Sequence, residues 1–146
     1  MNILQEIKKD HQEVKELFKK LQSIKSQKER EKEFLELKKE LIPHMKAEEE
    51  IFYPALMNGD SKEPVLEGFE EHHASEMVLK DLDKTAVTHE RWPAKLKVLS
   101  EMIEHHIKEE ESEIFKMARS EMDKEKLEEL AEKFDSKKQN VRKLLK

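Results

Sequence analysis

The sequence of 146 residues contains no cysteine, only two glycines and only 5% aromatic residues. Without cysteine the chain can form neither a disulfide nor a cysteine-held iron–sulfur cluster, so any bound metal must take histidine or carboxylate ligands. Little glycine and few aromatic residues, beside abundant lysine, glutamate and leucine, predict an all-α protein. The length predicts one small domain.

Long apolar runs and basic stripes are also missing. The net charge of −5 comes from acids and bases that are interspersed along the chain. No apolar run approaches the roughly 20 residues that span a bilayer, and no basic stripe indicates nucleic acid. The first six residues have neither the basic flank nor the apolar stretch of a signal peptide. We therefore expect a cytoplasmic protein that binds neither nucleic acid nor membranes.

Apolar residues recur every three or four positions in five segments, as in amphipathic helices. The expected helices cover about residues 3–24, 29–57, 61–85, 92–115 and 123–146. Pro43 predicts a bend rather than a break, because the apolar phase continues past it. Short connections favour an antiparallel up-down-up-down four-helix bundle over residues 1–120. An additional C-terminal helix, residues 121–146, is expected to pack on this bundle within the same domain.

Histidines recur on the apolar stripes of these helices, three of them with a glutamate four residues later. Residues i and i+4 lie on one face of a helix, so each pair can present a nitrogen and an oxygen to one point. In the third segment the stripe reads Val65, Phe69, His72, Glu76 and Leu79. The candidate metal ligands in all segments are His11, His44, Glu48, His72, Glu76, His106 and Glu110.

A metal ion explains why these polar residues occupy core positions. Burying three carboxylates without partners would cost several kcal/mol each, against a domain stability of roughly 5–15 kcal/mol. A cation supplies the missing charge. Four imidazoles and three carboxylates favour two ions of iron or manganese, with zinc less suited to so many ligands. Glu48 and Glu110 are candidates for bridging both ions, since each follows an equivalent motif in a weak internal repeat, residues 44–49 and 106–111.

Neighbouring residues of the same chemistry remain alternatives as ligands. These alternatives are His73, His105 and Glu111. Adjacent residues point about 100° apart around a helix, so both members of a pair rarely reach one metal. The second member is better placed for an outer hydrogen bond or for solvent.

The order and spacing of these motifs resemble the hemerythrin-like (HHE cation-binding) domain. The resemblance rests on residues 10–14 (DHQEV), 44–49 (HMKAEE) with 52–54 (FYP), 71–73 (EHH) and 105–111 (HHIKEEE) with Phe115. It covers about residues 3–118 and implies a four-helix bundle around a non-haem di-iron centre. The two iron ions, Fe²⁺ or Fe³⁺, would share an oxo or hydroxo bridge and carboxylates. The residues that match ligand positions are His11, His44, Glu48, His72 and His106.

Two departures from the oxygen-carrying hemerythrins bear on function. Glu76 takes the place of their second histidine in the third helix, and their fourth-helix carboxylate would correspond to Glu111, whereas the helical phase here prefers Glu110. An extra carboxylate should stabilise ferric iron and can occupy the position that oxygen would use. Reversible oxygen transport is therefore the less favoured function. The expected function is binding or sensing of dioxygen, a related small molecule such as nitric oxide or peroxide, or iron.

Two other classes of function fit parts of the pattern. A ferritin-like di-iron oxidase, or another iron-handling enzyme, needs two Glu-x-x-His motifs on separate helices. The chain contains only one such motif, Glu70-x-x-His73, so an iron-handling enzyme is the less favoured interpretation. A metal-free helical interaction module would contain no metal and gain no stability from iron. A sensor without an attached effector would signal through a protein partner that the sequence does not identify.

Overall fold

The computed structural model describes residues 1–145, and this part of the chain is helical without any strand. The α-helices are α1 (Ile3–Ser23), α2 (Gln27–Ala47), α3 (Lys62–Asp83), α4 (Trp92–Glu109), α5 (Phe115–Glu121) and α6 (Lys124–Arg142). Two π-helical turns, Glu48–Phe52 and Glu110–Ile114, and two 3₁₀ turns, Tyr53–Leu56 and Gly59–Ser61, complete the regular structure. The all-α prediction is confirmed.

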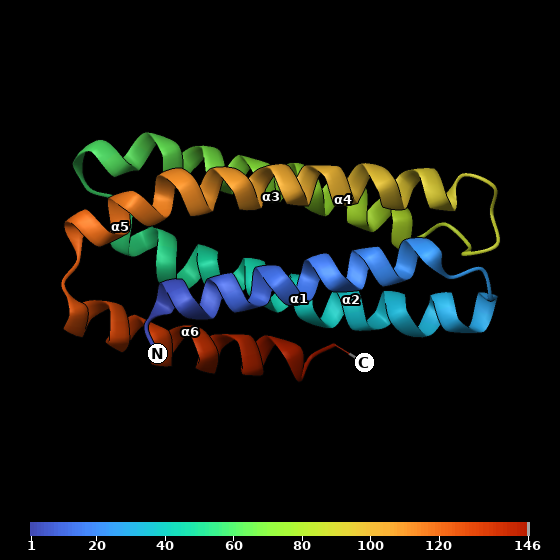
Figure 1. Cartoon of the computed structure of the whole chain (residues 1–146), viewed down its shortest axis with the longest axis horizontal. Coiled ribbons are helices and arrows are strands. Elements are labelled where there is room, and N and C mark those ends of the chain that lie inside the picture. Colours follow the sequence, from blue (N-terminus) through green and yellow to red (C-terminus); the bar gives the residue numbers. More distant parts are fainter. Residues whose placement is uncertain (146) are drawn as a thin grey trace.

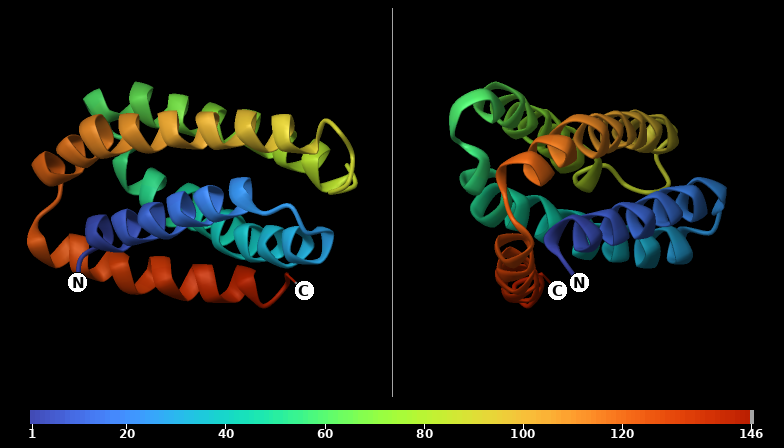
Figure 2. Two further views of the ribbon diagram at one scale, coloured as in Figure 1. Left: turned by 45° about the vertical axis from the view of Figure 1, so that its right-hand side comes forward. Right: turned by 60° about the vertical axis from the view of Figure 1, so that its left-hand side comes forward.

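The helices form the expected antiparallel bundle, with one helix added outside it. Figure 1 shows α1 beside α2 and α3 beside α4, with the two pairs stacked on each other. The last helix, α6, lies against α1 and α2 on the side away from α3 and α4 (Figure 2). None of the helices within residues 1–145 is long and apolar enough to cross a membrane.

Side-chain caps explain where three of the helices begin. The Asn2 side chain accepts from the backbone N–H of Gln5, whose side chain accepts from the Asn2 N–H, so two unpaired donors are satisfied at the start of α1. Ser26 and Asp123 cap α2 and α6 in the same position. Because α6 has its own cap, it starts as a separate helix rather than as an extension of α5.

The second and fourth bundle helices are less regular than their sequences predict. α2 stays α-helical through Pro43, but both expected long helices pass into a π turn, at Glu48 and at Glu110. There the backbone N–H of Tyr53 donates to the Glu48 carbonyl and that of Phe115 to the Glu110 carbonyl, five residues earlier. Each π turn therefore brings an aromatic residue onto the side of the helix that carries the glutamate.

The buried side chains form two apolar clusters with a polar layer between them. One cluster, which includes Val14, Met45 and Leu79, fills the half of the bundle near the loops 24–26 and 84–91. The other, which includes Ile7 and Phe52, fills the opposite half and receives Leu127, Leu130 and Phe134 from α6. α1, α2 and α3 contribute to both halves, whereas α4 contributes to the first half and is continued into the second by Ile114, Phe115 and Ala118. Each of α1 to α4 places a buried histidine at the level where the two halves meet.

Candidate metal centre

Six buried side chains from the four bundle helices meet in this polar layer. They are His11 of α1, His44 of α2, Glu48 and Glu110 at the starts of the π turns, His72 of α3 and His106 of α4. Two sets of four have ligand atoms that all lie within 4.8 Å of one another. One set contains His11 and His44, the other contains His72 and His106, and both contain Glu48 and Glu110. The two glutamates are thus shared between two potential metal positions.

The imidazole Nε2 atoms of all four histidines point at the glutamate oxygens. His11 Nε2 lies 3.1 Å from Glu110 Oε1, and His44 Nε2 lies 3.3 Å from Glu48 Oε1. On the other side, His72 Nε2 lies 3.0 Å from Glu48 Oε1. The Nε2 atoms of His72 and His106 are only 3.1 Å apart. Nitrogen and oxygen lone pairs converge in this way where a cation sits between them.

The other ring nitrogen of each histidine contacts an outer carboxylate from a neighbouring helix. The Nδ1-to-oxygen distances are 2.7 Å for His11–Glu111, 2.9 Å for His44–Asp10, 2.8 Å for His72–Glu49 and 2.6 Å for His106–Glu71. We call Asp10, Glu49, Glu71 and Glu111 the outer carboxylates. They form a closed ring, since each helix supplies one histidine and the carboxylate that holds the histidine of another. Donation from Nδ1 to a carboxylate fixes the tautomer and leaves the Nε2 lone pair free for a metal.

Three atoms of the centre are buried without a hydrogen-bond partner among the described residues: His11 Nε2, Glu48 Oε2 and Glu110 Oε1. An unpaired polar atom in the interior costs free energy unless a bound ion or molecule satisfies it. A pair of cations would engage all three atoms and neutralise the two inner carboxylates. The residues present therefore fit a dinuclear metal site.

Without metal, the centre would hold protons instead. Burial alone lowers the pKa of His44, but Glu48 and Asp10 outweigh it and raise the pKa to about 10. The pKa of His106 is likewise raised well above its ordinary value, because burial is outweighed by Glu110. Burial raises the pKa of Glu48, yet the neighbouring histidines, His44 foremost, lower it well below its usual range. Protons and metal ions therefore compete for the same nitrogens.

Tyr53 adds a hydroxyl to one half of the centre. Its oxygen lies 2.5 Å from Glu110 Oε2, to which it donates, and within 3.4 Å of the Nε2 atoms of both His72 and His106. Burial, followed by Glu110 and Glu48, raises the pKa of this phenol well above its ordinary value. Gly68 of α3 permits the close approach, since a Cβ there would lie 3.1 Å from the phenol oxygen.

The two halves of the centre differ at the position that Tyr53 occupies. In the internal repeat, Glu48 corresponds to Glu110 and Tyr53, five residues later, to Phe115. The Phe115 ring stacks on His11 with centroids 6.3 Å apart and planes 11° apart. The His72/His106 half therefore has a phenol beside its nitrogens, and the His11/His44 half has an apolar ring.

Of the candidates from sequence, Glu76 does not reach the centre. Its side chain is 26% exposed and pairs with Lys46 at 3.4 Å. The buried residues of α3 are Val65, Gly68, His72, Ser75, Leu79 and Leu82. The inward position after His72 is thus Ser75, three residues on, because the spacing alternates between three and four. Hydrophobicity alone does not identify Gly68 and Ser75 as inward-facing, although both are buried because they are small. It predicts Phe69 and Glu76 at these positions instead, and both are only half-buried.

The alternative ligands also lie outside the six-residue cluster. His73 is exposed, and the His105 side chain is 65% exposed, 3.9 Å from Glu71. Glu111 belongs to the outer ring, where it accepts from His11, while Glu110 lies in the centre. Each pair of neighbours thus divides into one buried member and one outer or exposed member, as the 100° rotation between adjacent residues requires.

Sequence reasoning did not assign roles to Tyr53 or to three of the outer carboxylates, Asp10, Glu49 and Glu71. A signal for the carboxylates exists, since each outer carboxylate is the direct sequence neighbour of an inner residue, as in Asp10-His11 and Glu48-Glu49. The role of Tyr53 depends on the π turn, for which the sequence gives no comparable signal.

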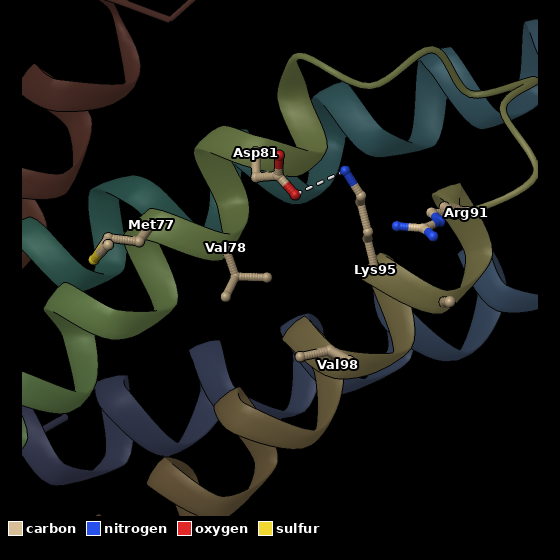
Figure 3. A pocket seen from close by; sticks show the side chains of 7 residues that line it. Met77, Val78, Asp81, Arg91, Lys95 and Val98 are labelled. Atoms are coloured by element: carbon tan, nitrogen blue, oxygen red, sulfur yellow. Dashed lines mark ion pairs between the residues drawn. The ribbon is translucent and has the colours of Figure 1, made fainter.

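An open groove on the surface, between α3 and α4, is separate from this centre. Figure 3 shows Met77, Val78 and Val98 lining it, beside an ion pair between Lys95 and Asp81. The Lys95 Nζ and Asp81 Oδ2 atoms of this pair are 2.8 Å apart. None of the six clustered residues lines this groove. The chemistry of the described part of the chain is therefore concentrated in the buried centre.

Comparisons with known proteins agree with this architecture. Residues 2–118 match the family model described as the hemerythrin HHE cation binding domain. The crystal structure of a hemerythrin HHE cation binding domain-containing protein from Mycobacterium kansasii has a TM-score of 0.88 and 25% identity, over 99% of this chain and 89% of that chain. A DNA nickase from Nostoc sp. is 26% identical over 145 residues. The match covers 99% of this chain but 41% of the nickase, so the chain spans less than half of that relative.

Proposed function

Because this chain belongs to the family of hemerythrin HHE cation-binding domains, we propose that it holds two iron ions and uses them to bind or sense dioxygen, a related small diatomic molecule, or iron. The observation that supports two ions most directly is the sharing of Glu48 and Glu110 by both sets of possible ligands. His11 and His44 would hold one ion, and His72 and His106 the other. Each inner carboxylate would contact both.

The donor set favours iron among the metals that cells supply. Four imidazoles and two carboxylates, without sulfur, suit iron or manganese, whereas zinc commonly takes four ligands in a closed tetrahedron. Two bridged iron ions supply reversible one-electron redox chemistry at a site that can accept a small exogenous ligand. We therefore propose an oxo- or hydroxo-bridged pair of iron ions, with manganese or zinc as the alternatives.

The protein residues would control what reaches the metals and how the ligands are held. The outer carboxylates fix the orientation of the four imidazoles, and the two apolar clusters exclude water above and below the centre. Tyr53 holds its proton toward Glu110 at the level of the inner ligands. Since Glu76 pairs with Lys46 at the surface, it is Tyr53 rather than Glu76 that would modify the His72/His106 half and its access to small ligands.

The relative's name does not extend this proposal to DNA. The DNA nickase is a protein of which this chain spans 41%, so nicking activity is not part of the function proposed here. The features that carry the proposal are the buried imidazoles and carboxylates, which suit a metal-bound small ligand.

We expect anaerobic reconstitution with ferrous iron to load roughly two ions per chain, as in other helical di-iron bundles. Exposure to air should then produce near-ultraviolet absorption from a bridged ferric pair. Elemental analysis and the electronic spectrum measure the two results. One ion or none per folded chain would contradict the dinuclear centre. Cycling between nitrogen and air separates reversible binding or sensing from irreversible oxidation.

Replacing Tyr53 by phenylalanine tests the inequality of the two halves. We expect Tyr53→Phe to weaken binding of one ion by about tenfold, a typical cost of removing a group that supports the ligands, and to leave the other ion unchanged. Competition of ferrous iron with a chelator measures both affinities. The visible spectrum of the ferric protein distinguishes the roles of Tyr53, because a bound phenolate gives an intense charge-transfer band and a hydrogen-bonded phenol does not.

Gly68→Ala is a useful companion to this variant. The added Cβ would lie 3.2 Å from Tyr53 Cζ and displace the ring without removing the hydroxyl. If Tyr53→Phe and Gly68→Ala each bound both ions as tightly as wild type does, Tyr53 would have no part in metal binding.

A further inference from the structure

The C-terminal helix reaches the metal centre through a chain of charged groups. Lys138 of α6 donates from Nζ to Asp10 Oδ1 at 2.7 Å, and Asp10 Oδ2 accepts from His44 Nδ1 at 2.9 Å. His44 in turn presents Nε2 to Glu48, 3.3 Å away. A lysine of the helix outside the bundle is thus two contacts away from a candidate ligand nitrogen.

Asp10 differs from the other outer carboxylates in its surroundings. The Asp10 side chain is 4% exposed, whereas the side chains of Glu49, Glu71 and Glu111 are 19%, 22% and 24% exposed. Water can solvate the three glutamates directly, but Asp10 depends on protein groups. Lys138, whose side chain is only 15% exposed, supplies the positive charge that a buried carboxylate requires.

The same helix also covers the ring that Asp10 holds. Phe134, one turn before Lys138, packs edge-on against His44 with centroids 5.9 Å apart. The Lys138 ammonium lies 5.4 Å from the centroid of the Phe134 ring. Phe134 is fully buried, so α6 closes this side of the centre with one apolar and one charged side chain.

We propose that Lys138 is a positioning residue of the metal centre, which acts through Asp10 on His44 and couples the docking of α6 to metal binding in the His11/His44 half. This inference rests on the proposed dinuclear function. Without the ammonium, the buried Asp10 carboxylate must find another donor, and it turns away from His44 to do so. His44 then loses the contact that fixes its ring, and the ion held by His11 and His44 binds more weakly.

The coupling must also act in the opposite direction. If docked α6 strengthens metal binding, then bound metal strengthens the docking of α6 by the same factor. Loading the centre would therefore reduce the local opening of α6.

The test compares Lys138→Met with Lys138→Arg and with the matched control Lys137→Met. Lys137 is the preceding residue, and its ion pair goes to Glu50 on the surface, 2.9 Å away. We expect Lys138→Met to weaken one of the two ferrous ions by tenfold or more in chelator competition, with the second ion unchanged. Lys138→Arg should restore most of the affinity, and Lys137→Met should match wild type.

A second measurement uses only the wild-type protein and does not depend on whether any variant folds. Amide hydrogen exchange of residues 124–142 should slow when iron is bound, beyond the change in a helix far from the centre. The role of Lys138 is overturned if iron leaves the exchange of α6 unchanged, or if wild type and folded Lys138→Met bind both ions with equal affinity. The di-iron proposal still stands in that case, provided that the wild-type protein binds two ions. A wild-type protein that binds fewer than two ions overturns the di-iron proposal, and this inference with it.

Discussion

Glu48→Gln is expected to eliminate high-affinity binding of both iron ions, although it changes one atom of one residue. Glu48 belongs to both sets of possible ligands and contacts histidines of both halves, His44 at 3.3 Å and His72 at 3.0 Å. Glutamine keeps the shape but loses the negative charge and one of the two oxygen donors. A histidine substitution removes a ligand from one ion, whereas this substitution weakens a ligand that both ions would share.

Thermal unfolding gives a second readout of the same loss. A ligand that binds only the folded state stabilises it by about 2.7 kcal/mol when its concentration is 100 times the dissociation constant. We expect ferrous iron to raise the unfolding temperature of wild type by several degrees and that of Glu48→Gln by almost nothing. The metal-free variant should still fold, since glutamine can accept hydrogen bonds from the surrounding histidines.

Glu76→Gln is the matched control, because it makes the same chemical change at another glutamate. The sequence predicts Glu76 as a metal ligand, but the fold places it outside the centre. Glu76 pairs with Lys46 at the surface, so this variant should retain both ions and the full thermal shift. If Glu76→Gln lost an ion, or if Glu48→Gln retained both, the arrangement of ligands proposed here would be contradicted.

Metal-free and iron-loaded protein are expected to respond to pH in opposite directions. In the metal-free state the pKa of His44 rises from 6.5 to about 10 on folding, because Glu48 and Asp10 outweigh burial. A raised pKa contributes stability that is complete below 6.5 and is lost as the pH rises toward 10. The metal-free protein should therefore lose stability as the pH rises from 6.5 toward 10, with His106 adding to the same trend.

The acidic side of the curve has the opposite cause. The pKa of Glu48 is lowered on folding by His44 and its neighbours, which outweigh the effect of burial. Its contribution is complete above the ordinary value of 4.5 and is lost as the pH falls toward the lowered pKa. Maximum stability of the metal-free protein is thus expected between 4.5 and 6.5, the ordinary values of these two groups.

Bound iron should reverse the fall in stability at alkaline pH, because a metal binds the neutral imidazole and displaces its proton. Iron affinity, and the stabilisation it brings, should therefore increase as the pH rises through neutrality, with protons released on binding. Urea unfolding at several pH values, with and without iron, measures both slopes. His89→Ala, which removes an exposed loop histidine, should leave them unchanged, while Asp10→Asn should flatten the metal-free slope. A metal-free protein whose stability does not fall above neutral pH would contradict the ion pairs of the centre.

The fold class could be predicted because it depends on short-range regularities. Apolar spacing located the four bundle helices and the C-terminal helix, and short connections fixed their antiparallel order. The histidines of the centre could also be recognised, because each replaces an apolar residue on a stripe. Where the stripe depended on size rather than polarity, at Gly68 and Ser75 of α3, the predicted phase led to Glu76 instead.

The π turns mark the limit of periodicity as a guide. Each π turn changes the phase of its helix immediately after a clustered glutamate, and this change directs Tyr53 into one half of the centre and Phe115 into the other. In a regular α-helix, residues five positions apart point about 140° apart, so neither ring would lie on the side that carries its glutamate. The sequence shows that Tyr53 and Phe115 differ, but only the tertiary structure places them beside the two halves of the centre.

The sequence by itself determined the helices, the histidines that face inward and the kind of donor available to a metal, because these follow from composition and from spacing along one helix. Only the tertiary structure decided which carboxylate holds which histidine, that Tyr53 enters the centre and that Lys138 of α6 reaches Asp10. Those contacts join residues up to 128 positions apart. They depend on which faces of neighbouring helices meet and on the relative height of their side chains, and spacing along one helix determines neither.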